Sequence, residues 1–456
     1  MTDTRQHPAV LFRYSGGFLF ALLAPLVPVV LSGAPVGYWL FVQLPLAAVV
    51  ILWGILRWKK CLWRNGGSVS LSSGVLLKHS RIIPQSSIAC VELCRSPFLS
   101  LIGASRVTFR TPSQPNDRKL TLTLGRKNAA DLILSTLPLG LSKDGVSDRS
   151  SARETAILAA SGSNMASGLL ILIPVISKLS KLGIAAAERL EEGAYILLPR
   201  LPKAAAIAAF VPAVGWLLHF FYNCIHNARF ESIRSGNCII IRRGAISRRT
   251  SYLPTEHISA VDTRRTLLLL FFKRSSAAVL SNGCAPFHII PAARESELKN
   301  RLSFIIPRPH GMPVELEPDR GCRPKYYIIR LVFTLVSACL LIRLSYGSST
   351  ERLFAPAFIP VTVLLVWYTL IGAAASMRAK VVLSGDSVEI TGSRFFTVHT
   401  VRIYRSQIAE IKIKQSPLQI QRGLCDLYIR PCGQKHGIAC RFLSIERAEK
   451  FSLMLR

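Results

Sequence analysis

The sequence predicts an α+β membrane protein that contains six transmembrane helices in three hairpins, with a small strand-rich domain after each hairpin. Three observations lead to this fold class. A short motif occurs three times, pairs of uncharged apolar runs alternate with basic polar segments, and each polar segment shows strand periodicity that ends in one helical stretch. The same unit is therefore expected three times along the 456 residues.

The repeated motif is anchored on Ile88, Ile258 and Ile408. A branched apolar residue follows each anchor by three positions and a hydroxyl residue by eight, and a glycine follows by fifteen in the first and third copies. Lys273 replaces the glycine in the second copy, and Tyr404 replaces the proline in the third. Fixed offsets of this kind indicate internal duplication. We assign structural roles in the strands to Pro84, Ile88, Ser96, Gly103, Pro254, Ile258, Thr266, Ile408, Ser416 and Gly423.

Three long stretches are apolar enough to hold two membrane-spanning helices each. Residues 14–56 contain no charged residue and no histidine, and one spanning helix needs only about 20 apolar residues. Ser-Gly-Ala-Pro at residues 32–35 supplies a turn between the two halves. A cleaved signal peptide is the rival interpretation of the first run, but it would leave the second half of that run as a lone span. The expected transmembrane hairpins are residues 14–56, 155–225 and 326–377.

The polar segments that follow the hairpins are predicted to be β-rich domains. Short runs of alternating apolar residues, separated by Gly and Pro, are typical of strands. Each segment closes with a helical pattern, as in residues 445–455, where Ala448, Phe451 and Leu455 lie on one face. The predicted domains are residues 57–142, 226–306 and 378–456.

The charge balance indicates on which side of a membrane these domains lie. The chain has 57 Lys and Arg residues against 25 Asp and Glu residues, a net charge of +32. Cytoplasmic segments collect Lys and Arg near the ends of spans, so the three domains and both termini are expected in the cytoplasm of a multi-pass protein of the cell membrane. Each basic residue near an anionic leaflet adds about 1 kcal/mol of attraction. The candidates to face lipid are Arg57, Lys59, Lys60, Arg229, Arg248, Arg249, Arg378, Lys380, Arg402 and Arg405.

Residue patterns for catalysis or metal binding do not occur in the sequence. The eleven cysteines include no Cys-x-x-Cys pair, and the nine histidines include no His-x-x-x-His pair. A Gly-x-Ser-x-Gly motif and a phosphate-binding glycine loop followed by Lys-Ser or Lys-Thr are also missing. We therefore predict no catalytic residue, no metal site, no cofactor and no enzymatic activity. Nucleic acid is not expected as a partner either, because few aromatic residues cluster to stack bases.

The motif and its position after paired apolar runs resemble the second type of bacterial PH domain, also called the membrane-flanked domain. The residues that carry the resemblance are the Ile-Pro-x-x-x-Ile-x-x-Val run from Ile83 to Val91, then Ser96-Pro97-Phe98 and Gly103. Three copies resemble the YdbT-like membrane proteins of Gram-positive bacteria. The resemblance implies that each domain is a PH-like β-sandwich or barrel closed by a C-terminal helix. It also implies a part in envelope stress or defence against antimicrobial peptides, and a shorter membrane relative with a single such domain as a partner.

These observations predict a non-enzymatic membrane protein whose PH-like domains bind the anionic inner leaflet or a protein partner. Two alternatives stay open. Prolines in the apolar runs, such as Pro25, Pro45 and Pro212, are compatible with a transporter or flippase-like protein whose spans form a pathway. The apolar run at residues 267–272 is compatible with a membrane platform that recruits a protein partner.

Overall fold

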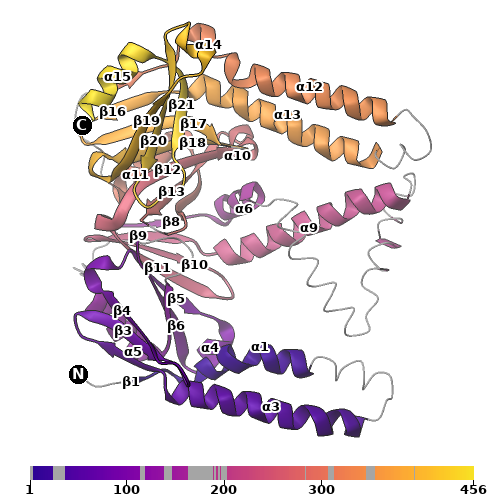
Figure 1. Cartoon of the computed structure of the whole chain (residues 1–456), viewed down its shortest axis with the longest axis vertical. Helices are drawn as coiled ribbons and strands as arrows, with labels where there is room; N and C mark the ends of the chain where they lie inside the picture. Colours follow the sequence, from indigo (N-terminus) through magenta and orange to yellow (C-terminus); the bar gives the residue numbers. More distant parts are fainter. Residues whose placement is uncertain are drawn as a thin grey trace.

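Most of the chain is described by a computed structural model. The described residues are 4–23, 36–112, 119–137, 146–162, 188, 192–193, 196, 203–282, 284–306, 313–345, 355–394 and 396–455. They form a tall stack of β-sheets from which long helices project on one side (Figure 1). The expected turn at residues 32–35 lies outside this described part.

Three repeats of strands and a closing helix make up the stack, in the order that strand and helix periodicity predict. The first repeat consists of β2 (Leu62–Asn65), β3 (Ser68–Ser73), β4 (His79–Pro84), β5 (Cys90–Arg95), α4 (Pro97–Leu101), β6 (Ala104–Arg110), β7 (Lys119–Gly125) and α5 (Arg126–Thr136). The second consists of β9 (Glu231–Ser235), β10 (Cys238–Arg243), β11 (Arg248–Pro254), β12 (Ile258–Thr266), α10 (Leu267–Phe271), β13 (Arg274–Ser281), β14 (Phe287–Arg294) and α11 (Glu295–Ile305). The third consists of β16 (Val381–Ser384), β17 (Ser387–Arg394), β18 (Thr397–Tyr404), β19 (Ile408–Lys414), α14 (Pro417–Ile420), β20 (Leu424–Pro431), β21 (Ile438–Ser444) and α15 (Ile445–Met454).

Neighbouring repeats share their sheets. The second half of the first repeat and the first half of the second form one seven-stranded sheet, in the order β7-β6-β5-β11-β10-β9-β8, where β8 is Val146–Arg149. The second and third repeats are joined in the same way, in the order β14-β13-β12-β18-β17-β16-β15, where β15 is Val314–Leu316. We call the β5–β11 pairing the first junction and the β12–β18 pairing the second junction. At the two ends of the stack remain a four-stranded sheet, β1-β2-β3-β4 with β1 at Thr4–Arg5, and a three-stranded sheet, β19-β20-β21.

Both junctions use the same antiparallel register. Tyr252 lies opposite Val91 in the first junction, and Arg402 lies opposite Val261 in the second. Tyr252 and Arg402 each lie six positions before the anchoring isoleucine of their own copy. Val91 and Val261 each lie three positions after the anchor of the preceding copy. Buried residues of two repeats then merge into one core, because Ala89 and Cys90 pack among the apolar side chains of the second repeat. The repeats are therefore built as one continuous body.

The repeated motif marks the start and the end of a short helix in each repeat. Ser96 and Thr266 accept hydrogen bonds from the backbone N–H groups of the third helical residues of α4 and α10, and Ser416 forms a capping box with Gln419 at α14. The residue fifteen positions after the anchor has positive φ in all three copies: Gly103, Lys273 and Gly423. Glycine adopts this left-handed conformation without strain, so the lysine at the second position is the unfavourable one.

The anchoring residues reach the interior with the help of a bulge. A register shift follows Ile258 in β12, and another follows Ile408 in β19. A bulge re-aims side chains on one strand, so Ile258 and Val261, three positions apart, are both buried. Ile408 and Ile411 are only partly buried, because β19 lies at the edge of its sheet.

The helices do not match the six predicted spans. They are α1 (Leu11–Leu23), α3 (Val36–Lys59), α6 (Ala152–Gly162), α9 (Lys203–Asn227), α12 (Lys325–Ser345) and α13 (Ala355–Arg378). Figure 1 shows that α1 and α3 lie side by side, as do α12 and α13. They leave large apolar side chains exposed, among them Phe41 and Ile329.

The prediction of six transmembrane helices in three hairpins is wrong. Over the residues that the structure describes, no helix combines the length and the apolar character needed to cross a membrane. Within the described residues, α1 covers 13 residues and α6 covers 11, which is about 20 Å or less at the rise of an α-helix. The α3 helix contains Pro45, and α12 carries Arg330, whose guanidinium donates to the Ser393 hydroxyl at 3.1 Å. The expected multi-pass location in the cell membrane, with cytoplasmic domains and termini, rested on those spans and is overturned with them.

Candidate functional site

The first junction carries a strongly basic cleft. Its volume is about 280 Å³, and it lies over one face of β5, β6, β7, β10 and β11, next to α1. Six cations and one carboxylate, Glu92, line it among the described residues. The cations are Arg13, Arg106, Arg110, Lys119, Arg243 and Arg249.

The strand alternation and the register of the shared sheet bring these cations together. Arg106 and Arg110 lie four positions apart on β6, so their side chains leave the same face of the sheet. Arg249 lies opposite Arg243 on one side and opposite Cys94 on the other, and Cys94 in turn lies opposite Arg106. A row of three arginines thus crosses strands that belong to two repeats. The cleft exists only because the two repeats share a sheet.

Like charges opposite each other on neighbouring strands destabilise a sheet unless an anion lies between them. Glu92 does not fill that role alone, because it forms an ion pair with Arg110 at 3.1 Å. The buried Nε atoms of Arg110 and Arg243 have no hydrogen-bond partner in the described part of the chain. The cleft therefore has positive charge and donor groups in excess of its own acceptors.

Burial and neighbouring charges shift the pKa values of groups in and beside the cleft. Burial, and after it the charge of Arg249, lowers the pKa of Arg243. Burial also lowers the pKa of His226, with Arg243 and Arg249 adding to the effect. Although burial opposes it, Glu92 raises the pKa of Arg110. An arginine titrates far above neutral pH, so both arginines stay cationic and the cleft can hold an anion.

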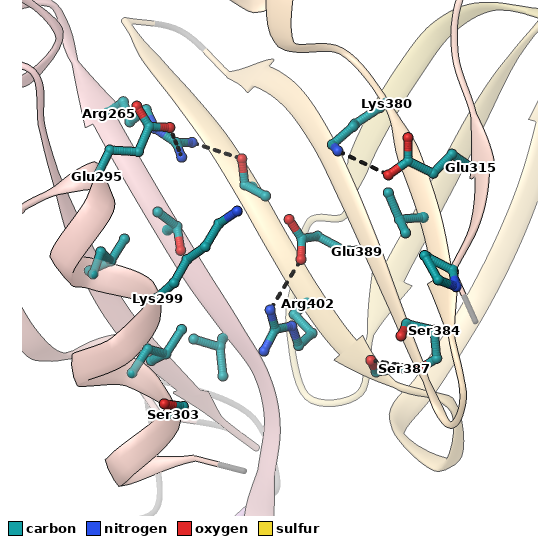
Figure 2. Close-up of a pocket in the computed structure, with 17 residues that line it drawn as sticks. Arg265, Glu295, Lys299, Ser303, Glu315, Lys380, Ser384, Ser387, Glu389 and Arg402 are labelled. Atoms are coloured by element: carbon teal, nitrogen blue, oxygen red, sulfur yellow. Dashed lines mark hydrogen bonds and ion pairs between the residues drawn. The ribbon is translucent and has the colours of Figure 1, made fainter. Parts of the chain in front are cut away.

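A second cavity, of about 340 Å³, lies at the second junction between α11 and the shared sheet (Figure 2). Here cations and carboxylates alternate. Arg402 donates to Glu389 at 3.3 Å and Lys380 lies 3.3 Å from Glu315, while Lys299 reaches from α11 toward Glu389. On the upper left of the view, Arg265 contacts Glu295 at 3.0 Å. Because four cations face three carboxylates, this cavity has little net charge to attract an anion.

A third cleft, of about 590 Å³, lies at the end of α10, where five cations surround Glu295. Arg265 and Arg378 both contact that carboxylate, at 3.0 and 2.8 Å. Two large apolar residues, Leu270 and Phe272, also line it. Each of the three short helices exposes a large apolar residue: Leu101 is 87% exposed on α4, Phe271 80% on α10 and Leu418 74% on α14.

The structure distributes the ten candidate lipid-facing residues over the whole stack. Arg249 lies in the first basic cleft. Lys380 and Arg402 lie in the charge-balanced cavity, and Arg378 lines the third cleft. The other six occupy exposed positions, and two of these bond to backbone carbonyls, Lys60 to that of Val75 and Arg405 to that of Leu455. These six are Arg57, Lys59, Lys60, Arg229, Arg248 and Arg405.

Five of the six cations in the first cleft are missing from the candidates that the sequence supplied. One signal was available, because Arg106, Thr108 and Arg110 alternate with buried residues on β6 and so define a polar face. Arg13 and Arg243 carry no comparable signal, because their place in the cleft depends on contacts between distant segments.

Among the described residues, no three His, Cys, Asp or Glu side chains lie close enough together to hold a metal ion.

Two thiols, Cys90 and Cys284, lie close together in the core, and burial raises the pKa of Cys90 well above its ordinary value. All eleven cysteines are free. The hydrogen bond with Cys90 lowers the pKa of Cys284, although burial opposes it. Both side chains are buried among the apolar residues of the second repeat, so the pair is part of the packed interior.

Comparisons with known proteins agree with the internal duplication. The family model described as "Bacterial PH domain" matches residues 18–137, 171–291 and 332–456. Three successive matches cover more than half of the chain. No curated protein and no solved structure matches.

Proposed function

We propose, from the premise that this chain belongs to the bacterial PH domain family, that it is a binding protein for anionic lipid headgroups and catalyses no reaction. PH domains are generally binding modules, and three repeats of this domain run through the chain. The narrower resemblance to YdbT-like proteins and a part in envelope stress stay predictions from the sequence.

The observation that carries the proposal is the imbalance in the first basic cleft, with six cations against one carboxylate. Arginine presents a planar fork of donors that matches the oxygens of a phosphate group. A phosphate between Arg243, Arg249 and Arg106 would relieve the repulsion along that row and accept from donors that lack a partner. The size of the cleft suits a phosphate-bearing headgroup better than an acyl chain.

Exposed apolar tips support a lipid source for that phosphate. Leu101, Phe271 and Leu418 are each at least 74% exposed, one on each short helix. Exposed apolar groups beside cations are typical of surfaces that contact the headgroup region of a membrane. The tips of α4 and α10 lie at the base of the projecting helices, since Phe98 packs on Phe12 of α1 and Leu270 packs on α13.

A transporter or flippase is a weaker alternative, because it needs spans that the described residues do not contain. Recruitment of a protein partner has a specific observation in its favour, the exposed edge strand β4. It uses another surface and is compatible with lipid binding at the cleft.

Vesicle co-sedimentation of the full chain tests the proposal. Vesicles of phosphatidylglycerol are expected to bind more chain than vesicles of phosphatidylcholine, and binding should weaken as salt is raised because screening shortens the reach of surface charges. Inorganic phosphate and glycerol phosphate, added as competitors, separate a headgroup site from a site for free phosphate. Equal binding to the two vesicle types would overturn the lipid proposal, and tighter binding of inorganic phosphate than of anionic vesicles would reassign the cleft to a soluble anion.

A further inference from the structure

The strands β4 and β19 each lie at the edge of a sheet, and they are the counterparts of strands that are paired on both sides inside the stack. The first-repeat strand β4 corresponds to β11 and β18, which pair with the preceding repeat at the two junctions. The third-repeat strand β19 corresponds to β5 and β12, which pair with the following repeat. Figure 1 shows the first and third repeats at opposite ends of the stack.

The β4 edge has the features of an unfilled junction. His79, Ser80, Arg81 and Ile82 are exposed in succession, and Ile82 is 65% exposed. The corresponding residue in the second repeat, Tyr252, is partly buried against the core of the first repeat. An edge strand presents unpaired N–H and C=O groups, and an added strand can pair with them.

The two internal junctions place an acidic residue at the same position of the register. In the first junction Ser251 lies opposite Glu92, and in the second Val401 lies opposite Asp262. The strand on the preceding repeat therefore has an acidic residue at this position both times. Arg81 is the residue of β4 that would face that acid, because it lies one position before Ile82 just as Ser251 lies one position before Tyr252.

The edge strand β19 of this chain does not have an acidic residue at that position. At the position of Glu92 and Asp262, β19 has Lys412, which forms an ion pair with Glu410 on the same strand. In the register of the junctions, Arg81 would face Lys412 and His79 would face Lys414. Like charges directly opposite each other oppose strand pairing, and edge lysines are a usual means of preventing association between copies.

We propose that the β4 edge is a docking site for a PH domain of another protein, whose β5-type strand pairs with β4 and places an Asp or Glu opposite Arg81. The docked strand would extend β1-β2-β3-β4 into a sheet like the two internal ones. The basic β19 edge prevents copies of this chain from joining head to tail.

Charge reversals at Arg81 and Lys412, made singly and together in the full chain, test this site. A photo-crosslinking residue, p-benzoylphenylalanine, replaces the exposed Ile82 and reports when a β5-type strand lies beside it. K412E gives β19 the Ile-Glu-Ile pattern that corresponds to Val91-Glu92-Leu93, so it should cross-link to β4 of a second copy. R81E should also cross-link to a second copy, because the new glutamate would face the natural Lys412. The double variant R81E/K412E should not cross-link, and neither should the chain without charge changes.

The expected gain in cross-linked fraction for each single variant is roughly fivefold or more at equal concentration. Thermal unfolding of all four chains is measured as a control, because Arg81 and Lys412 are exposed or half-buried edge residues whose exchange should leave the fold intact. Single variants that cross-link no better than the unchanged chain would overturn the proposal. So would efficient cross-linking of the unchanged chain to its own β19.

In cells, the photo-crosslinker at position 82 of the otherwise unchanged chain should attach to a PH domain strand that has Asp or Glu one residue after the attachment point. Attachment to a different kind of segment, or to none, would contradict the occupant that we propose. Failure here leaves vesicle binding at the basic cleft unaffected, so the two proposals fail separately.

Discussion

Asp262 on β12 and His399 on β18 meet across the second junction, with His399 Nδ1 3.0 Å from the Asp262 carboxylate. Arg264 donates to the same carboxylate at 2.6 Å. The contact joins the second repeat to the third, at a position where the first junction has Glu92 and Arg249. An acid on one repeat and a base on the partner strand thus recur where repeats share a sheet.

Removal of the Asp262 carboxylate should weaken the second junction. Although burial opposes it, His399 and then Arg264 lower the pKa of Asp262, so the carboxylate is charged at neutral pH. The D262A variant leaves two bases without their acceptor, and loss of one partner of a buried pair costs about 3 kcal/mol. Thermal unfolding should shift to lower temperature.

E317A serves as a control for that variant, because Glu317 pairs with Arg323 at an exposed site and should contribute less than about 1 kcal/mol. Equal stability of D262A and E317A would show that the junction does not depend on the pair.

Acid should destabilise the chain through His288 before the carboxylates titrate. Burial, and then Arg264 and Arg243, lowers the pKa of His288 to about 3. The unfolded chain binds this proton below about pH 6.5 while the folded chain does not, so the stability that the neutral ring supplies is lost as the pH falls from 6.5 toward 3. Each pH unit in that window should cost up to about 1.4 kcal/mol.

Unfolding temperatures of the parent chain and of H288Q between pH 7 and pH 4 test this effect. The variant is expected to show a shallower decline. Parallel curves for the two proteins would show that another group causes the acid sensitivity.

Lys273 should be replaceable by glycine with a gain in stability. Its φ of 51° lies in the left-handed region, and glycine occupies the same place in the other two copies. A non-glycine residue there costs about 1 kcal/mol, so K273G should unfold at higher temperature. K273A keeps the Cβ atom and removes the charge, so it should not show this gain. If both variants rise together, the benefit comes from the lost charge.

The repeat and the order of strands and helix within it could be predicted from the sequence, because they depend on local periodicity and on fixed offsets. The hydroxyl and the glycine of the motif also signal their positions, and in the structure they begin and end a short helix. The predicted spans were wrong because a run without charges does not by itself give a helix with the length and apolar character needed to cross a membrane. No helix among the described residues has both.

The shared sheets could not be predicted, because the pairing of β11 with β5 joins segments more than 150 residues apart and leaves no local pattern. The basic cleft depends on that pairing. Arg249 was a candidate for lipid contact from its charge alone, and that role stays a prediction. Arg243 could be added only when the register had placed it opposite Arg249.

The most direct test of lipid binding at the basic cleft is vesicle binding after charge reversal there. R106E/R249E changes two exposed cations of the cleft, while R447E/K450E changes two exposed cations on α15 and keeps the same net charge. Because each basic residue near an anionic surface adds about 1 kcal/mol, the cleft variant should bind phosphatidylglycerol vesicles at least about tenfold more weakly than the α15 control. Equal affinity of the two variants would contradict the assignment of the cleft as the headgroup site.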